Sequence, residues 1–414
     1  MIESISDYVP RPFYIEKIRP YIGSHIIKII TGQRRSGKSY ILHGLMDEIK
    51  KEKPKSKIIY INTELAEFRN IKTDTDLYNY ISSGLGRKKG YVFVDEIQEI
   101  DGFENAIKSL FAEGLADLYI TGSNSHLLSG ELATYLSGRY IMFTVHTLSY
   151  REFLVFHKLK KGEQSLQKYL KIGGLPYLPS LGADENLSHE YLKNVYESII
   201  LRDVVLKEKV RNVRFLENLI AYLADNTGSL FSANNISKYL KNQKIQIPVQ
   251  TIINYTRILE SSFLIHRVQR KEISGLKIFE IGEKYYFEDL GLRNNLTQND
   301  PVEDRAKVIE NAVYLFLIQN GYGIYAGKTE NNEIDFMAQK QKEVIYIQVC
   351  WRIDNDKTWK RETGNLLEIN DNFPKYIVTM DRESAGQNHK GIKIIHLENF
   401  LLAEPNAKSE LTFP

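Results

Sequence analysis

One stretch of this sequence, GQRRSGKS from Gly32 to Ser39, places two glycines, a lysine and a hydroxyl residue at the spacing G-x-x-x-x-G-K-[ST]. The glycines let the backbone turn tightly, so that its N–H groups and the start of the following helix point at a bound anion. In this pattern the lysine, Lys38, reaches the β- and γ-phosphates of a nucleotide, and the hydroxyl of Ser39 holds Mg²⁺. An apolar strand precedes the stretch and a helical pattern follows it, which is the context that a phosphate-binding loop requires.

The loop predicts ATP as the bound nucleotide and Mg²⁺ as its metal ion. A glycine-rich turn without a ligand is the alternative interpretation, and the flanking strand and helix argue against it. The residues expected to contact the nucleotide here are Gly32, Gln33, Arg34, Arg35, Ser36, Gly37, Lys38, Ser39 and Tyr40.

A second stretch supplies carboxylates. The apolar run Tyr91 to Val94 ends in Asp95 and Glu96. We expect Asp95 to hold Mg²⁺ through its water shell, and Glu96 to orient or deprotonate the attacking water. A surface acidic pair at a strand end is the alternative, but the position after a phosphate-binding loop favours hydrolysis of ATP over binding alone.

Polar residues at other strand ends are candidates for sensing the γ-phosphate. The strand expected between the loop strand and the acidic strand ends in TGSNSHLL, which makes Ser123 or Asn124 the candidate. A plain polar turn explains either residue equally well. Asn62 and Glu64, at the end of another strand, are weaker candidates.

Arginines are a further requirement, because hydrolysis of this kind often needs one to neutralise charge in the transition state. Arg139 in LSGRY and Arg202 in ILRDVV are the candidates, acting within one subunit or across to a neighbour. A structural salt bridge explains each of them equally simply. Arg34 and Arg35 could contact phosphate or a partner.

Composition limits the class of protein. The chain has 414 residues, 43% of them apolar and 26% charged, which is typical of a globular protein with two or three domains. We find no apolar run of the ~18 residues that a membrane span needs and no export signal, so we expect a cytoplasmic protein without a membrane contact. Cys350 is the only cysteine, which excludes an internal disulfide. A net charge of +3 does not indicate nucleic-acid binding over the whole surface.

Four segments differ in their patterns. Residues 1–150 alternate short apolar strands with helices, which predicts an α/β fold with a parallel sheet. Residues 151–225 are expected to be helical, and residues 226–297 have the helix, turn, helix, hairpin order of a winged helix. Residues 298–414 open with a helix from about Glu303 to Gln319 and continue with strands. The strands expected in the first segment are Ile26–Thr31, Ile58–Asn62, Tyr91–Val94, Leu118–Thr121 and Tyr140–Val145.

The winged-helix segment leaves DNA contact open. Its second helix presents Thr251, Asn254 and Arg257, which is few polar groups for reading a major groove. Modules of this kind also serve as packing or switch elements.

The order of these motifs resembles the prokaryotic AAA+-type ATPases, close to the archaeal ATPase and STAND groups, that carry a C-terminal domain of unknown function. The similar stretches are TGQRRSGKS, VFVDEIQEI, ITGSNSHLLSGELATYLSGRY, LSYREFL, GGLPYL, YYFEDLGLRNNL and NNEIDFMAQ. The resemblance implies an ATPase core, a helical lid, a winged helix and a last domain with the PD-(D/E)XK nuclease fold, also called restriction-endonuclease-like. It also implies that the element Gly174 to Pro176 approaches the nucleotide from the lid, which adds Pro176 to the nucleotide contacts.

The nuclease resemblance is incomplete in its chemistry. Such enzymes need a helix glutamate, a strand aspartate and then Glu-x-Lys on the next strand, which together bind Mg²⁺ and align water. Glu310 and Asp335 match the first two, but Gln348 and Cys350 stand at the Glu and Lys positions. An amide binds Mg²⁺ poorly and a thiol cannot replace an ammonium, so we predict the fold without nuclease activity.

Three functions follow from these observations. The first is an Mg²⁺-dependent ATPase that uses its nucleotide state to move the lid, the winged helix and the C-terminal domain. The second is a nucleotide-gated binding module for DNA or protein with little turnover, and the third is an active nuclease, against which Gln348 and Cys350 argue. Assembly into homo-oligomers and an unidentified protein partner both stay open.

Overall fold

The computed structural model describes residues 8–414 apart from residues 87, 125–135, 137, 183, 207, 209, 274–281, 298–300, 330–331, 354–355, 406–410 and 413–414. The chain divides into two compact units. The first extends to His146 and includes Ser261–Phe263, and the second begins at Thr147. In the described part of the chain, no helix combines the length and the apolar character that crossing a membrane requires.

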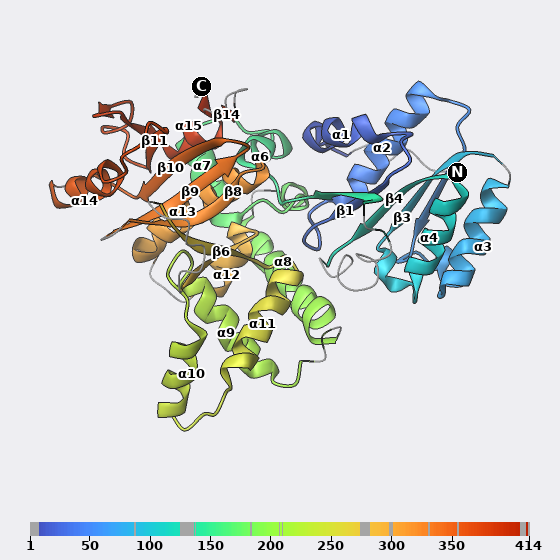
Figure 1. The fold of residues 1–414 in the computed structure, drawn as a ribbon, viewed down its shortest axis with the longest axis horizontal. Helices are drawn as coiled ribbons and strands as arrows, with labels where there is room; N and C mark the ends of the chain where they lie inside the picture. Colours follow the sequence, from blue (N-terminus) through green and yellow to red (C-terminus); the bar gives the residue numbers. More distant parts are fainter. Residues whose placement is uncertain are drawn as a thin grey trace. The chain divides into compact units, whose positions relative to one another are not determined.

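A five-stranded parallel sheet forms the centre of the first unit (Figure 1). Its strand order is β2-β3-β4-β1-β5, and every neighbouring pair runs parallel. All five strands predicted from apolar runs are confirmed, with small differences at their ends. Their bounds are β1 Ile27–Thr31, β2 Ile58–Asn62, β3 Gly90–Asp95, β4 Ala116–Gly122 and β5 Tyr140–Thr144.

Helices cover both faces of this sheet, which explains why its strands are apolar on both sides. On β3, Tyr91 and Phe93 belong to the core that α1 and α2 share, whereas Val92 and Val94 belong to the core of α3 and α4. The helix bounds are α1 Pro12–Ile18, α2 Lys38–Glu52, α3 Asp74–Leu85 and α4 Phe103–Glu113. The parallel α/β class predicted for this segment is confirmed.

The second unit begins with helices. Between residues 151 and 225, the described residues form helices and turns and no strand, as the sequence predicts. The bounds are α6 Tyr150–Phe156, α7 Glu163–Ile172, α8 Glu185–Ser198, a π-helix at Ile199–Leu206, and α9 Val213–Asp225. Two more helices follow, α10 Ala233–Asn242 and α11 Val249–Ser261.

An eight-stranded mixed sheet completes the second unit, in the order β12-β13-β11-β10-β9-β8-β6-β7. The sequence analysis assigned the hairpin β6–β7 and the last segment to different domains, whereas their strands share this sheet. The reason is that β6 pairs in parallel with β8, with Gln269 opposite Tyr325. The bounds are β6 Ile265–Glu272, β7 Glu283–Phe287, β8 Gly323–Lys328, β9 Glu333–Lys340, β10 Glu343–Cys350, β11 Lys375–Thr379, β12 Asn388–His389 and β13 Ile392–His396.

Helices also cover both faces of this second sheet. Side chains of α13 (Pro301–Gln319), such as Val313, share a core with Ile345 and Ile347 of β10. Leu366 of α14 (Asp356–Leu367) shares a core with Tyr346, on the opposite face of the same strand. The remaining elements are α12 Leu290–Leu296, α15 Leu397–Leu401, β14 Glu404–Pro405 and β15 Leu411–Thr412.

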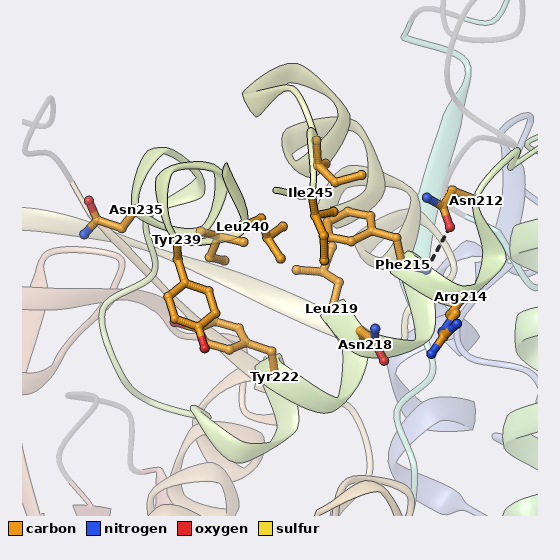
Figure 2. A pocket seen from close by; sticks show the side chains of 12 residues that line it. Asn212, Arg214, Phe215, Asn218, Leu219, Tyr222, Asn235, Tyr239, Leu240 and Ile245 are labelled. Carbon is orange, nitrogen blue, oxygen red and sulfur yellow. Dashed lines mark hydrogen bonds between the residues drawn. The ribbon is translucent and has the colours of Figure 1, made fainter. Parts of the chain in front are cut away.

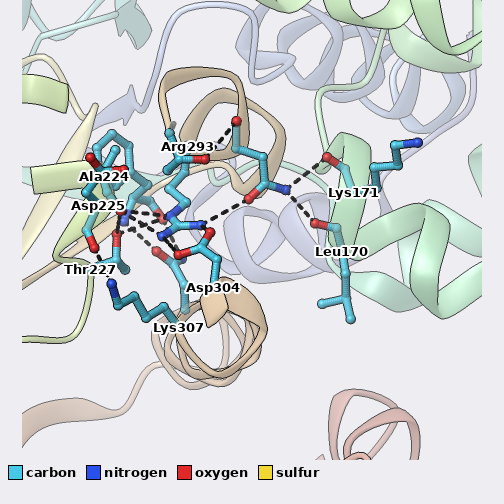
Figure 3. Close-up of polar contacts among 12 residues, drawn as sticks. Leu170, Lys171, Ala224, Asp225, Thr227, Arg293, Asp304 and Lys307 are labelled. Atoms are coloured by element: carbon cyan, nitrogen blue, oxygen red, sulfur yellow. Dashed lines mark hydrogen bonds and ion pairs between the residues drawn. The ribbon is translucent and has the colours of Figure 1, made fainter. Parts of the chain in front are cut away.

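A buried arginine holds the helices of the second unit together (Figure 3). Arg293 of α12 is fully buried and forms a bidentate ion pair with Asp304 of α13, with one Nη2–Oδ1 distance of 2.6 Å. The same guanidinium donates to the carbonyl of Ala224 at the end of α9, at 2.7 Å from Nη2. The neighbouring Asn294 donates to the carbonyls of Leu170 and Lys171 at the end of α7. One turn of α12 therefore ties three other helices.

Replacing this arginine should destabilise the second unit. Arg293→Ala leaves the buried Asp304 without its counter-charge, and we expect the free energy of unfolding to fall by about 3–5 kcal/mol. Lys171→Ala is the control, because the Lys171–Glu185 pair is exposed and such pairs contribute little. Both tryptophans of the chain, Trp351 and Trp359, lie in the second unit, so their fluorescence during urea unfolding measures its stability. Equal urea midpoints for the two variants would contradict the structural role assigned to Arg293.

Candidate nucleotide-binding site

Three strand ends meet at one edge of the first sheet. The loop of Gly32 follows β1, Asp95 ends β3, and Ser123 follows β4. Because β4 lies between β1 and β3 and all three strands are parallel, these residues reach the same edge. The position of β4 between β1 and β3 is the one predicted for the strand that carries the candidate γ-phosphate sensors.

Backbone geometry at the loop depends on glycine. Gly32 has φ +145°, and a Cβ at this position would lie 2.1 Å from the carbonyl oxygen of Val145. Gly37 has φ +96° and precedes the first residue of α2. Since the first N–H groups of a helix have no partner within the helix, those of α2 are available to an anion held by the loop.

Lys38 lies folded against its own loop. Its ammonium group donates to the carbonyl of Gly32 at 3.0 Å and to that of Gln33 at 3.1 Å, and it lies 3.7 Å from a carboxylate oxygen of Glu96. The residue is only 4% exposed. Loop carbonyls are weak partners for a buried ammonium, and phosphate oxygens can replace them.

Asp95 is buried with neutral partners. It is 1% exposed and accepts hydrogen bonds from the hydroxyls of Thr121 and Tyr60, the latter at 3.1 Å. Burial raises the pKa of Asp95, and hydrogen bonds from Thr121 and Ser39 oppose that effect only in part. A divalent cation beside the Ser39 hydroxyl and this carboxylate would supply the missing positive charge, so the donors present fit Mg²⁺.

Glu96 lies in a different electrostatic setting. Its backbone is left-handed, with φ +53°, which turns it out of the strand direction. Burial by itself would raise the pKa of Glu96, but the charge of Lys38 and a hydrogen bond from Gln98 bring it below the ordinary value. The carboxylate is therefore ionised at neutral pH, as a water-orienting group must be.

Several buried polar atoms near the loop have no hydrogen-bond partner among the described residues. They are the Thr31 hydroxyl, both polar atoms of the Gln33 side chain and the Ser36 hydroxyl. Buried polar groups of native proteins are almost always paired, so such a cluster is expected where a polar ligand binds.

The remaining loop residues face different surroundings. Arg34 forms an ion pair with Glu64 at 2.9 Å, so the structure joins one loop residue to one of the weaker strand-end candidates. Arg35 adopts φ +67°. Tyr40, on the first turn of α2, is 49% exposed and lies beside Tyr8.

Three residues of this site were missed in the sequence analysis. Arg11 is buried and donates to the carbonyls of Ser36 and His146, both at 2.9 Å. Tyr60 and Thr121 hold Asp95 from the strands on either side of β3. Thr121 also accepts a hydrogen bond from the N–H of Glu96 at 2.9 Å. A signal existed only for Thr121, as the polar residue inside the apolar run of the predicted sensor strand.

The sensor candidates lie where expected, but one arginine does not. Ser123 and Asn124 are buried at the end of β4, and Ser123 lies close enough to Glu96 to lower its pKa slightly. Arg139 immediately precedes β5, and its carbonyl accepts from the N–H of Ile27 at the start of β1. It is thus at the sheet edge opposite to the loop, about 16 Å away along a five-residue strand. A residue before a parallel strand lies at the other end of it from the loop, and a role for Arg139 in hydrolysis, in its own chain or a neighbour, stays a prediction.

The element Gly174 to Pro176 belongs to the second unit. There the N–H of Gly174 donates to Asp289 at 2.7 Å, and its carbonyl accepts from the N–H of Leu148 at 2.7 Å. Burial raises the pKa of Asp289 to about 6. Contact of Pro176 with nucleotide stays a prediction, as does any role of Arg202.

A second charged cluster joins β7 to the last segment. Lys284 of β7 is 3% exposed, and its ammonium lies 2.8 Å from Glu333, 3.6 Å from Glu310 and 3.8 Å from Asp335. Lys284 was missed because it precedes the segment that contains the other three, and only the shared sheet brings them together. The side-chain amide of Gln348 bridges two residues. Its oxygen accepts a hydrogen bond from the N–H of Asp335, and its nitrogen donates one to the carboxylate of Glu362.

The remaining residues singled out from the sequence are Cys350 and three polar residues of α11. Burial raises the pKa of the Cys350 thiol to about 12, so it is neither a base nor a nucleophile at neutral pH. On α11, Asn254 and Arg257 are exposed and Thr251 is half-buried.

Comparisons with known proteins agree with this geometry. Residues 24–154 match the family model of the AAA domain, and residues 163–303 match that of a domain of unknown function, DUF8612. Among solved structures, the Walker-type ATPase PABY2304 of Pyrococcus abyssi superimposes with a TM-score of 0.50 at 17% identity, over 70% of this chain and 97% of that one. At that identity the similarity shows the fold, which is that of a P-loop ATPase.

Two relatives extend the similarity along the whole chain. An uncharacterized protein of Haemophilus influenzae is 33% identical over 401 residues, which cover 95% of this chain and 98% of the relative. An uncharacterized protein of Methanocaldococcus jannaschii is 30% identical over 357 residues, or 81% and 77% of the two chains. The chain therefore belongs to the family of these two proteins, a family of P-loop proteins with an AAA domain.

Proposed function

We propose that this protein is an Mg²⁺-dependent ATPase with a single catalytic centre at the edge of the first sheet. The observation that carries the proposal is the convergence of Lys38, Asp95 and Glu96 at one edge, each with partners that a nucleotide and its cation can replace. An isolated loop would support binding only. An ionised Glu96 beside it supplies the group that hydrolysis needs.

The chain's own residues account for the main steps. ATP phosphates bind the loop N–H groups and the start of α2, and Lys38 exchanges the carbonyls of Gly32 and Gln33 for phosphate oxygens. Ser39 and Asp95 would hold Mg²⁺, which neutralises charge on the phosphates when it is bound. Glu96, whose N–H is fixed by Thr121, then accepts a proton from the attacking water or orients it.

We further propose that nucleotide state is passed to the second unit, whose helices 151–225 act as a lid and whose residues 226–297 form a winged helix. Arg11 supports this, because it links the carbonyl of Ser36 in the loop to that of His146, the last residue before the second unit. The exposed Asn254 and Arg257 leave DNA contact through α11 as a separate prediction.

The last segment, in our proposal, has the restriction-endonuclease-like fold without nuclease activity. The order of elements supports this fold: α13, the antiparallel strands β8, β9 and β10, then α14 and β11 parallel to β10. Gln348 supports the lack of activity, because its neutral amide stands where such nucleases have a carboxylate, accepts from the N–H of Asp335 and donates to Glu362. Cys350, at the lysine position, is buried and its thiol is neutral at neutral pH.

Two substitutions test the ATPase proposal. Lys38→Ala should abolish binding of a fluorescent ATP analogue, because it removes the charge that meets the phosphates. Glu96→Gln should keep binding and lower ATP turnover by at least about 100-fold, the usual contribution of a positioned base. Glu99→Gln, an exposed acidic residue nearby, should turn over ATP like the wild type.

Each outcome distinguishes the alternatives. Turnover that survives both substitutions unchanged would refute the proposal. Tight ATP binding by the wild type with negligible turnover, with or without DNA, would favour the nucleotide-gated binding module instead.

The carboxylates around Lys284 make a prediction about pH. Burial and the neighbouring Glu310 raise the pKa of Asp335 above its unfolded value, so the folded protein keeps a proton that the unfolded chain releases. The contribution of Asp335 to stability is therefore largest near pH 4 and falls as pH rises through the raised pKa. Asp335→Asn should make the urea midpoint, followed by tryptophan fluorescence, depend less on pH between pH 5 and 8. Asp371→Asn, near the surface beside Lys375, should keep the wild-type dependence.

A further inference from the structure

An open groove lies between α9 and α10 in the second unit, with a volume of about 700 Å³. Figure 2 shows that apolar side chains meet in its middle, whereas Asn212 and Arg214 lie at one end and Asn235 at the other. The lining residues are Asn212, Arg214, Phe215, Asn218, Leu219, Tyr222, Asn235, Ile236, Tyr239, Leu240, Ile245 and Ile247.

The groove is apolar yet uncovered. None of the residues of α10 is buried, although its apolar residues recur at helical spacing. Tyr239 is 63% exposed and Ile245 is 46% exposed, while Phe215 and Leu219 form a buried floor on α9. Apolar helix faces normally pack against another element, so these exposed side chains offer an apolar surface to a partner.

Positive charge predominates around the groove. Glu217 and Asp225 lie on α9, but the sequence contains no aspartate or glutamate between Asp225 and Glu260, whereas it contains Lys238, Lys241 and Lys244 there. These three lysines are exposed, and Lys244 directly precedes the lining residue Ile245. Arg214 is the one charged side chain among the lining residues, and none of them is acidic. A helix is about 10–12 Å across, close to one Debye length, so ammonium groups on the far side of α10 still act on the groove.

The interior of the groove favours a protein partner over a nucleic acid. Phosphate backbones are held by lysines and arginines that line a channel, whereas the middle of this groove is aliphatic and aromatic. An amphipathic helix is the segment that places apolar side chains in such a groove and charges along its rim. The ten residues of α10 span about 15 Å, the length of roughly ten helical residues of a partner.

We propose that the α9–α10 groove binds an acidic amphipathic helix of a partner protein. Its apolar anchors, spaced i, i+3 or i+4, and i+7, fill the space between Leu219 and Leu240. Its aspartates and glutamates face Arg214 and Lys244. This surface is separate from the nucleotide site, and the proposal stands whether or not the protein hydrolyses ATP.

Selection from a random peptide library tests this while the partner is unidentified. Displayed peptides of 14 random residues are selected on the full-length protein and counter-selected on Tyr239→Glu/Ile245→Glu, which changes two exposed groove residues. Enriched peptides are expected to carry apolar residues at helical spacing and a net negative charge. By fluorescence anisotropy, the best of them should bind the double variant at least ten-fold more weakly. Leu187→Glu, at an equally exposed leucine of α8 outside the groove, should bind like the wild type.

Charge reversal supplies an independent measurement. Arg214→Glu/Lys244→Glu leaves the apolar surface intact. This variant should bind the selected peptide more weakly than the wild type does. It should bind more tightly than the wild type a version of the peptide whose acidic residues are replaced by lysine. Circular dichroism and the urea midpoint establish that each variant is folded.

Three results would overturn the proposal. They are selection without enrichment relative to the groove variant, enrichment of peptides with a net positive charge, and failure of charge reversal to change peptide affinity. Fluorescein-labelled single- and double-stranded DNA of 20 nucleotides is measured in parallel. If the wild type binds DNA and Tyr239→Glu/Ile245→Glu does not, the groove is a nucleic-acid site. That result would also contradict the proposal.

Discussion

A charge that leaves water must meet an opposite charge or several hydrogen bonds, and much of this chain is arranged around that demand. Arg293 meets it completely, through a bidentate pair with Asp304 and a helix carbonyl. Lys284 meets it through three carboxylates contributed by one helix and one strand. Lys38 meets it only in part, with two backbone carbonyls and a carboxylate at 3.7 Å.

These differences separate structural charges from those available for chemistry. The Arg293–Asp304 pair already satisfies both charges, so a ligand would not stabilise it further. Separating the two residues would disrupt the packing of the helices that they join. Lys38 and the neighbouring Asp95 are both buried with partners weaker than a phosphate or a metal ion. In the proposed function, Mg²⁺ and ATP would favour each other's binding, since each supplies the charge that one side of the site needs. At Lys284 the ammonium and the surrounding carboxylates already pair with one another, and in our proposal these charges are structural.

Most features of the fold and of the site that the sequence predicted come from local patterns of residues. The loop from Gly32 to Ser39 and the acidic end of β3 are each a few consecutive residues, and apolar runs marked all five strands of the first sheet. What was missed depends on contacts between distant segments. Tyr60 and Lys284 reach their sites only through strand order and register, and Arg11 reaches the loop from the position before α1. The pairing of β6 with β8 was likewise invisible, since parallel partners leave no signal in either strand alone.

The backbone that joins the two units is held by contacts within each of them. On the nucleotide side, Val145 packs so closely on Gly32 that no side chain fits between them, and Arg11 fixes the carbonyls of Ser36 and His146 together. Thr147 is the next residue. Within the second unit, its N–H donates to the Glu288 carboxylate at 3.0 Å and its hydroxyl to the Glu288 carbonyl at 2.9 Å. The connecting backbone is thus held on both sides of a single peptide bond. In the proposed coupling, a shift of the loop on phosphate binding would act on this peptide bond through Arg11.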